Sequence, residues 1–258
     1  MAELTLARRD ANGDRPACTA GIAGERPTRV RGAAAALARG WLALRRFGRG
    51  TRGLVLETID GVPLVVLPQV FNPVRLRSGA LMARALNRLP LDDPARLAVL
   101  DLGTGSGIGA VFAARRGATV AAVDINPEAV RCARINALLN HAEDRIAVHL
   151  GDLFEPVRGR SFDLILFNPP FYRGRPRDDH DHAWRGLDVF ERFAAGLDRA
   201  LAPGGCVLLT LSTDGDGAEL LDVLVAAGFA VEVVEQTDLL NEVITVYGVR
   251  RGAAVEGP

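Results

Sequence analysis

The residues with the clearest chemical potential in this 258-residue sequence are Asn168-Pro169-Pro170-Phe171, which directly follow the apolar run FDLILF. A short apolar run bounded by turn residues predicts a buried strand. In an open α/β sheet, ligands bind beyond the carboxyl ends of such strands. There the Asn168 side-chain oxygen and the Pro169 carbonyl could accept two N–H bonds, while the prolines stiffen the loop and the Phe171 ring stacks on a planar group. We therefore expect a ligand-binding loop at this position.

A second candidate site begins at Asp101, where the apolar run from Leu97 to Leu100 ends. Glycines follow at positions 103, 105, 107 and 109, and they let the backbone turn tightly and approach a ligand because no Cβ is in the way. The next stretch is rich in small residues and predicts a helix, whose first turn offers unpaired N–H groups to an anion. Residues 105–110 match the G-x-G-x-x-G/A dinucleotide fingerprint, so nicotinamide and flavin enzymes stay open here.

Two further carboxylates follow predicted strands. Asp124 ends the strand expected over 118–124, where a carboxylate can accept hydrogen bonds from both ribose hydroxyls of a nucleotide cofactor. Its structural alternative is an N-cap of the helix that starts near Asn126. Asp152, in the string GDLF, follows the strand expected over 145–150, and a purely structural role at the strand end is its alternative. Both acids are candidates for the same cofactor site.

Strands and helices alternate along most of the chain, which predicts an α/β fold with a parallel sheet. The strands are expected over 97–100, 118–124, 145–150, 161–167, 206–211, 229–235 and 242–250, and the helices over 127–140, 188–201 and 216–227. The last two strands are joined by a turn too short for a parallel crossover, so they must be antiparallel. The predicted fold is a Rossmann-like, doubly wound, mostly parallel sheet with an antiparallel last hairpin.

The chain is expected to divide into three parts. Residues 1–31 lack sustained periodicity and predict a basic, disordered tail; residues 32–90 form a unit on the cofactor side, and residues 91–252 form the catalytic domain. The expected elements of the second part are a helix over 33–47, a hairpin of strands 54–59 and 62–67 around Asp60-Gly61, and a helix over 78–89 with Ser78 as its N-cap.

These motifs together resemble the class I methyltransferases that use S-adenosylmethionine (SAM). D-x-G-x-G-x-G resembles their first motif, whose acidic residue faces the ammonium group of the cofactor, and VDINPEAV resembles their second. NPPF resembles the N/D-P-P-Y/F motif of enzymes that methylate planar nitrogens. The antiparallel last hairpin also suits this family. The resemblance implies SAM contacts from Asp101, Gly103, Thr104, Gly105, Gly107, Asp124, Ile125, Asp152, Leu153 and Asn168, with Asp152 beside the adenine amine.

From about Leu67 to Arg250 the chain resembles the release-factor glutamine methyltransferase group in its compact form. VLPQVFNP resembles the segment that covers the cofactor, and DHAWRGLDVFERF resembles the piece after the catalytic loop. The resemblance implies that Asn168 and Pro169 accept the two N–H bonds of a poorly nucleophilic amide and aim its nitrogen at the SAM methyl group. The catalytic residues would be Asn168, Pro169, Pro170 and Phe171.

The sequence departs from that group in two places that bear on the methyl acceptor. Phe171 stands where the group usually has Tyr, and the loop GRPRDDHDHAWRG is unusually charged. The first hypothesis for the acceptor is a protein glutamine, for example in a peptide chain release factor. The alternative is an exocyclic base amine in RNA or DNA, or a small metabolite. A nicotinamide oxidoreductase is disfavoured because the chain has no Lys for a Tyr-x-x-x-Lys pair, and an inactive SAM-binding scaffold is disfavoured by the intact NPPF.

Composition and charge indicate where the protein acts and whether it binds RNA or a metal ion. The chain is 48% hydrophobic and 24% charged, without an apolar run of transmembrane length or a secretory signal, so a cytoplasmic enzyme is expected. Residues 1–53 hold 11 Arg against four acidic residues, a charge of +7 that could contact RNA or belong to a solvated tail. The three cysteines form no C-x-x-C pair, and the acidic and His-containing loop 178–182 is expected to be a solvated lid. No metal site is therefore predicted.

Overall fold

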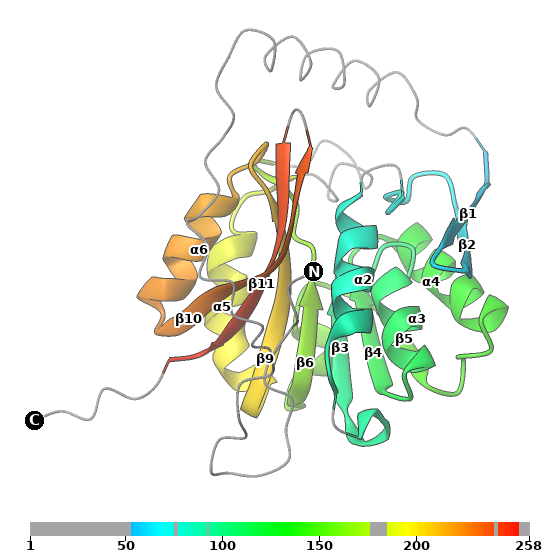
Figure 1. Cartoon of the computed structure of the whole chain (residues 1–258), viewed down its shortest axis with the longest axis horizontal. Coiled ribbons are helices and arrows are strands. Elements are labelled where there is room, and N and C mark those ends of the chain that lie inside the picture. Colours follow the sequence, from blue (N-terminus) through cyan, green and yellow to red (C-terminus); the bar gives the residue numbers. More distant parts are fainter. Residues whose placement is uncertain (1–52, 75–76, 92, 176–184, 240–241, 253–258) are drawn as a thin grey trace, which may run out of the picture.

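A central sheet sandwiched between two layers of helices dominates the structure, a computed structural model (Figure 1). The structure describes residues 53–74, 77–91, 93–175, 185–239 and 242–252. The predicted tail over 1–31, the predicted helix over 33–47 and the predicted lid over 178–182 lie outside these ranges. Among the described residues, no helix is both long and apolar enough to span a membrane.

The main sheet has seven strands in the order β10-β11-β9-β6-β3-β4-β5. Their bounds are β3 (Ala98–Leu102), β4 (Thr119–Asp124), β5 (Ile146–Leu150), β6 (Phe162–Phe167), β9 (Leu201–Ser212), β10 (Phe229–Leu239) and β11 (Glu242–Arg251). All neighbours pair in parallel except β11, which runs antiparallel to both β9 and β10. The predicted fold class, including the antiparallel last hairpin, is confirmed.

One strand begins earlier than the sequence indicates. We predicted a strand from residue 206, because Pro203-Gly204-Gly205 reads as a turn, but β9 already starts at Leu201, which pairs with Phe162. The register shifts between Phe162 and Leu164, so the extra residues form an irregularity within the strand. The position favours glycine, because a Cβ at residue 205 would lie 3.0 Å from three backbone carbonyl oxygens.

Five longer helices form the two layers. Helices α2 (Ser78–Arg88), α3 (Ile108–Arg115) and α4 (Pro127–Leu139) cover one face of the sheet, and α5 (Val189–Ala200) and α6 (Gly217–Ala226) cover the other (Figure 1). Successive strand residues point to opposite faces of the sheet and so belong to different hydrophobic clusters. Val99 packs with α2 and α3 on one face, and Leu100 packs with α5 on the other. The strands are buried on both faces, which explains why they read as nearly continuous apolar runs.

The shorter elements lie at the ends of the sheet. Strands β7 (Tyr172–Arg173) and β8 (Arg185–Gly186) form a small parallel pair, and η1 (Pro94–Arg96) and η2 (Glu155–Val157) are single 3₁₀ turns. The chain leaves β3 toward one edge through β4 and β5, and then returns to β6 on the other side of β3. Such a reversal opens a crevice at the carboxyl ends of the strands, where α/β proteins bind ligands. The glycine loop and the NPPF loop therefore meet at this crevice.

The predicted hairpin is confirmed. Strands β1 (Val55–Ile59) and β2 (Val62–Val66) are antiparallel, and both turn residues, Asp60 and Gly61, have positive φ, as a two-residue hairpin turn requires. The hairpin contacts α4 through three side chains spaced four residues apart on one helix face. These are Cys132, Asn136 and Asn140, and all three donate hydrogen bonds to backbone oxygens of β2.

The prediction that Ser78 caps α2 is wrong. The helix begins at Ser78 itself, the preceding Arg77 has φ 63°, and no side chain caps the first turn. Gly79 packs against the loop before the helix so closely that a Cβ would lie 2.6 Å from Cβ of Pro73. The Ser78 side chain is fully buried, and its hydroxyl accepts a hydrogen bond from Asn168 instead of serving the helix end. The preference of serine for capping a helix is thus not realised here, and its hydroxyl contacts Asn168 at the candidate site instead.

Candidate active site

A cavity of about 270 Å³ lies at the carboxyl ends of β3, β4 and β6. Its volume is close to the lower end of the range of about 300–1,000 Å³ that is typical of small-molecule pockets. The sequence-predicted residues that line it are Asp101, Gly103, Thr104, Gly105, Asp124, Ile125, Asp152, Leu153, Asn168, Pro169 and Pro170. Gly107 and Phe171 are not among the described residues of its lining. Both predicted loops thus contribute to one cavity.

Asp101 places a buried carboxyl group under the first turn of α3. Its Oδ2 accepts hydrogen bonds from Thr104 Oγ1 at 2.6 Å and from Ala110 N at 2.8 Å. Burial raises the pKa of this carboxyl to about 6; the two hydrogen bonds act in the opposite direction, and Asp124 adds a small further increase. A cation entering the cavity would favour the ionised form of Asp101 and would be attracted to it.

The four glycines of the loop serve two different purposes. Gly103 and Gly105 have φ of 59° and 55°, and a Cβ at either would meet nothing closer than 3.9 Å, so the backbone is open to a ligand there. A Cβ at Gly107 would lie 2.9 Å from Cα of Ala133 on α4, and one at Gly109 would lie 2.8 Å from Oδ1 of Asp101. The first pair leaves space for a ligand, and the second pair allows close packing.

Asp124 fastens the glycine loop to the end of β4. Its Oδ2 accepts from Gly105 N at 2.8 Å and its Oδ1 accepts from Asn126 N at 2.9 Å, with the residue 9% exposed. The N-cap of α4 is Asn126, whose side-chain oxygen accepts from Glu128 N at 2.9 Å. The alternative interpretation of Asp124 as the helix cap is therefore wrong. Its predicted contact with ribose hydroxyls stays a prediction.

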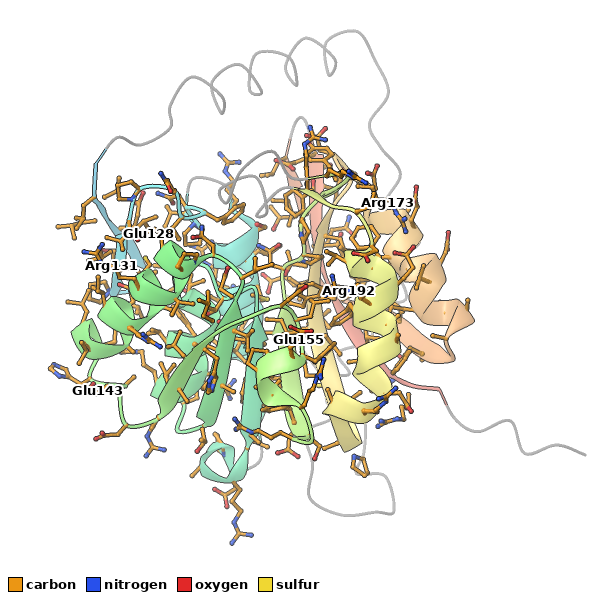
Figure 2. The ribbon with its side chains drawn as sticks, turned by 180° about the vertical axis from the view of Figure 1, so that it is seen from behind. Glu128, Arg131, Glu143, Glu155, Arg173 and Arg192 are labelled. Atoms are coloured by element: carbon orange, nitrogen blue, oxygen red, sulfur yellow. The ribbon has the colours of Figure 1, made fainter. Side chains whose placement is uncertain are left out.

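The far end of the cavity contains an ion pair that the sequence analysis missed. Arg192 reaches from α5 to Asp152, the predicted adenine neighbour, and both side chains line the cavity (Figure 2). Next to them Leu153 has φ 44°, a backbone conformation that is uncommon for a leucine. The only sequence signal for Arg192 was its position four residues after Asp188, to which it also pairs. The lining also includes Gln69 and Phe71 from the segment VLPQVFNP, Arg185 and Leu187 from the segment DHAWRGLDVFERF, and Met82 of α2.

Asn168 has one end of its amide held and the other end without a partner. Its Nδ2 donates to Ser78 Oγ at 3.1 Å, across 90 residues of sequence. Its Oδ1 is buried and accepts no hydrogen bond from any described residue. A buried acceptor without a donor costs free energy, of the order of 1–3 kcal/mol, unless a ligand supplies the donor. The predicted role of this oxygen, to accept an N–H from a ligand, is compatible with its unsatisfied state and stays a prediction.

The other end of the NPPF loop is clamped by the turn after β9. The Phe171 carbonyl accepts from Asp216 N at 2.7 Å, and Arg173 N donates to Oδ2 of Asp216 at 2.8 Å. A Cβ at Gly215 would lie 2.3 Å from the Phe171 carbonyl oxygen, so only glycine fits. Arg173 also pairs with Glu191 of α5 and Glu219 of α6 (Figure 2). Phe171 is 6% exposed, and its predicted stacking on the acceptor stays a prediction.

Comparisons with known proteins identify the family to which the chain belongs. The family described as the methyltransferase small domain matches residues 62–238. A Methanocaldococcus jannaschii protein, provisionally named protein N5-glutamine methyltransferase, is 34% identical over 70% of this chain and 90% of its own length. Release factor glutamine methyltransferase of Geobacter sulfurreducens is 32% identical, over 73% of this chain and 69% of that protein.

One further sequence relative is named for ribosomal RNA, and one solved structure shares the fold. The ribosomal RNA small subunit methyltransferase C of Alcanivorax borkumensis is 34% identical over 66% of this chain, which spans about half of that protein (48%). The crystal structure of the Methanocaldococcus jannaschii tRNA m1G37 methyltransferase superposes with a TM-score of 0.57 at 21% identity, over 79% of this chain and 58% of that one. With its seven-stranded sheet and its match to the family over residues 62–238, the chain belongs to the methyltransferase small domain family and has the class I methyltransferase fold.

Proposed function

We propose that this protein uses SAM to methylate a planar nitrogen, with a glutamine amide of a protein as the acceptor. The observation that carries the proposal is the side-chain oxygen of Asn168, a buried acceptor that no described residue satisfies; Asn168 lines the same cavity as the glycine loop. An amide NH₂ group supplies the N–H donor that this oxygen needs. The acceptor chemistry thus follows from an unsatisfied atom of the site.

The cofactor half of the cavity fits SAM. The carboxyl of Asp101 suits the ammonium group of the cofactor, because a cation stabilises its ionised form. Gly103 and Gly105 line the cavity without a side chain, and Asp124 and Asp152 line it as well, where they would contact the ribose and the adenine. When bound, SAM supplies an electrophilic methyl group attached to a positively charged sulfur. Asp101 and Asp124 would hold the amino acid and nucleoside parts apart and so orient that group.

The acceptor half would position a weak nucleophile. An amide nitrogen has a delocalised lone pair, so it reacts only when it is held close to the methyl carbon and in line with the bond that breaks. Asn168 Oδ1 and the Pro169 carbonyl would accept its two N–H bonds and fix the direction of the nitrogen. Held in this way, the nitrogen would take the methyl group that SAM supplies, with the S–C bond breaking as the N–C bond forms, and would give up one of its two hydrogen-bonded protons to solvent. Apolar neighbours such as Phe71 and Met82 line the cavity and would exclude water.

A protein glutamine is favoured over a base amine by the extent of the match. The relative provisionally named for protein glutamine is matched over 90% of its length, whereas the ribosomal RNA enzyme is matched over 48%. A release factor is the first acceptor to test, because the Geobacter sulfurreducens relative bears that name. Such an acceptor would be met at the translation machinery in the cytoplasm. An exocyclic base amine would use the same two N–H bonds and is the second candidate.

Methyl-labelled SAM can identify the acceptor. The protein would be incubated separately with purified release factors, ribosomal proteins and total RNA of the same organism, with Asn168→Ala as the inactive control. We expect label in a release factor, recovered as N5-methylglutamine after complete hydrolysis. Label only in RNA would replace the glutamine proposal by the base-amine alternative. No SAM binding in calorimetry, together with tight binding of NADH, would overturn the methyltransferase mechanism itself.

A further inference from the structure

We propose that Asn126 is a positioning residue for SAM, because its side chain holds the segment between β2 and α2 in place beside the cofactor half of the cavity. We call this segment, residues 67–73, the wall segment. Its residues that line the cavity are Gln69, Val70, Phe71 and Pro73. The inference rests on the proposed use of SAM. The family resemblance implies SAM contacts from Asp124 and Ile125 and none from Asn126.

The two ends of the Asn126 amide make different hydrogen bonds, and both partners are backbone groups. Oδ1 accepts from Glu128 N at 2.9 Å and so caps α4, whereas Nδ2 donates to Gln69 O at 3.1 Å. A backbone N–H can only donate and a carbonyl oxygen can only accept, so these partners fix which end of the amide is the oxygen. One side chain thus has two tasks, and only the first is that of a helix cap.

The bond to Gln69 completes a chain of hydrogen bonds across the cofactor half. Gly105 N donates to Asp124 Oδ2 at 2.8 Å, and Asp124 Oδ1 accepts from Asn126 N at 2.9 Å. The Asn126 side chain then continues the chain to the wall segment. Residues 69, 105, 124 and 126 all line the cavity. The glycine loop, the predicted ribose contact and the wall segment are therefore connected through Asn126.

The backbone of Gln69 depends on its surroundings. Its φ is 66°, a conformation that is uncommon for a residue with a Cβ and that persists where neighbouring groups hold it. The next residue, Val70, is buried in an apolar cluster with Ala129 of α4. Without the bond from Asn126, the wall segment would keep this apolar contact but lose the restraint on the Gln69 carbonyl. SAM binding would then also have to order the segment, which opposes binding.

Asn126→Ser separates the two tasks. Serine caps a helix about as well as asparagine, so the bond from Glu128 N should be retained. Its single hydroxyl lies one bond nearer the backbone than the amide groups, so as a cap it leaves Gln69 O without a donor. The Kd for SAM, measured by calorimetry, should rise about 3- to 10-fold, the scale of one hydrogen bond. A role as helix cap alone predicts wild-type affinity.

Asn140→Ser is the matched control. Asn140 follows the last turn of the same helix, is 9% exposed against 8% for Asn126, and donates through Nδ2 to Pro63 O at 3.0 Å. The same substitution thus removes a similar bond to the chain before α2, but Asn140 is not among the described residues that line the cavity. Its Kd for SAM should stay within about twofold of the wild-type value.

Hydrogen exchange provides a second readout that needs no ligand. In the absence of SAM, the backbone amides of residues 69–72 should exchange faster with solvent in Asn126→Ser than in the wild type or in Asn140→Ser. Faster exchange together with weaker SAM binding would support the positioning role.

Three results would overturn the proposal. They are wild-type SAM affinity in Asn126→Ser, an equal loss of affinity in Asn140→Ser, and weaker SAM binding with unchanged exchange, which would make Asn126 a direct SAM contact. If the wild type itself bound no SAM, the proposed function would be refuted and this role with it. Normal SAM binding by the wild type, with any of the three results above, would refute the role of Asn126 alone.

Discussion

The two halves of the cavity are built over very different sequence distances. In the cofactor half, Asp101 bonds residues three and nine positions away, and Asp124 bonds a residue 19 positions away. In the acceptor half, the amide of Asn168 is held by Ser78, 90 positions away. The part of the cofactor half around Asp101 and Asp124 is thus held by contacts between residues close in the sequence. The acceptor half exists only when α2 has packed on the completed sheet.

The halves also differ in how their polar atoms are satisfied. The Asp124 carboxylate oxygens accept hydrogen bonds from backbone N–H groups within the loops, whereas Asn168 Oδ1 accepts none from the described residues. The cofactor half is already organised before a ligand arrives. The acceptor half keeps an unsatisfied atom that a ligand can complete. Substitutions in the first should therefore change SAM affinity or stability, and substitutions in the second should change turnover.

The largest effect is expected from Asn168→Ala, which removes the oxygen that we propose accepts an N–H from the reacting nitrogen. Turnover should fall about 100- to 1000-fold, as for the loss of one preorganised polar group in a catalytic site. SAM affinity, titrated separately by calorimetry, should change little. Asn168→Asp keeps an oxygen acceptor and should retain more activity than Asn168→Ala. Wild-type turnover in Asn168→Ala would show that NPPF has only a structural role. The expected difference between the halves, turnover against SAM affinity, would then not hold.

Asp124→Ala should act on the other half. It removes the carboxylate that holds Gly105 N and Asn126 N and is predicted to contact the ribose. The expected loss is about 2–4 kcal/mol of SAM binding free energy, the scale of breaking partly buried, charge-assisted hydrogen bonds. Asp124→Asn keeps one acceptor oxygen and should lose less. A loss of turnover at unchanged SAM affinity would contradict this assignment.

A comparison of two glycines can separate packing from ligand binding within the cofactor half. Gly107→Ala forces a Cβ against Ala133 and should lower the free energy of unfolding by about 1–3 kcal/mol, as overpacking does. Gly105→Ala is the control: its φ is also positive, but no atom lies within 3.9 Å of the added Cβ. It should be the more stable of the two in urea and the poorer binder of SAM. If Gly105→Ala were the less stable variant and Gly107→Ala the poorer binder of SAM, Gly105 would be the packing residue and Gly107 the ligand-binding one.

The smallest effect is a pH dependence of SAM affinity. The pKa of Asp101 is raised to about 6 by burial, so this carboxyl gains its charge as the pH rises through 6. If the charge attracts the cofactor ammonium, SAM affinity should be constant above pH 7 and about tenfold lower at pH 5, where roughly one carboxyl in ten is ionised. Calorimetry across this range provides the measurement. Asp101→Asn should bind weakly with no such slope; an equal slope in both proteins would place the titrating group elsewhere.

The same contrast explains what the sequence could predict. The alternation of strands and helices, the hairpin at Asp60-Gly61 and the convergence of the two loops depend on local patterns, and the structure confirms them. The cap expected at Ser78 was wrong, because the hydroxyl's partner comes from a strand end far along the chain.

Two further features were beyond sequence reasoning for a related reason. Nothing in D-x-G-x-G-x-G distinguishes Gly105, which faces a cavity, from Gly107, which faces Ala133, because Ala133 belongs to a later helix. Arg192 escaped notice because its partner, Asp152, lies 40 residues away in the sequence, in the loop after β5, whereas Arg192 belongs to α5. Contacts between separate elements depend on packing, which a single sequence does not display.

The asparagines through which α4 contacts the hairpin form hydrogen bonds with backbone atoms of the hairpin. Asn136 accepts from Val65 N and donates to Val65 O, both at 2.7 Å, and Asn140 donates to Pro63 O at 3.0 Å. These backbone bonds do not depend on which side chains the hairpin carries, whereas the inward-facing Leu64, Val65 and Val66 are buried in the core and restrict its inner face. The outward-facing positions, such as Leu56, can therefore vary without loss of the bonds that hold the hairpin on α4.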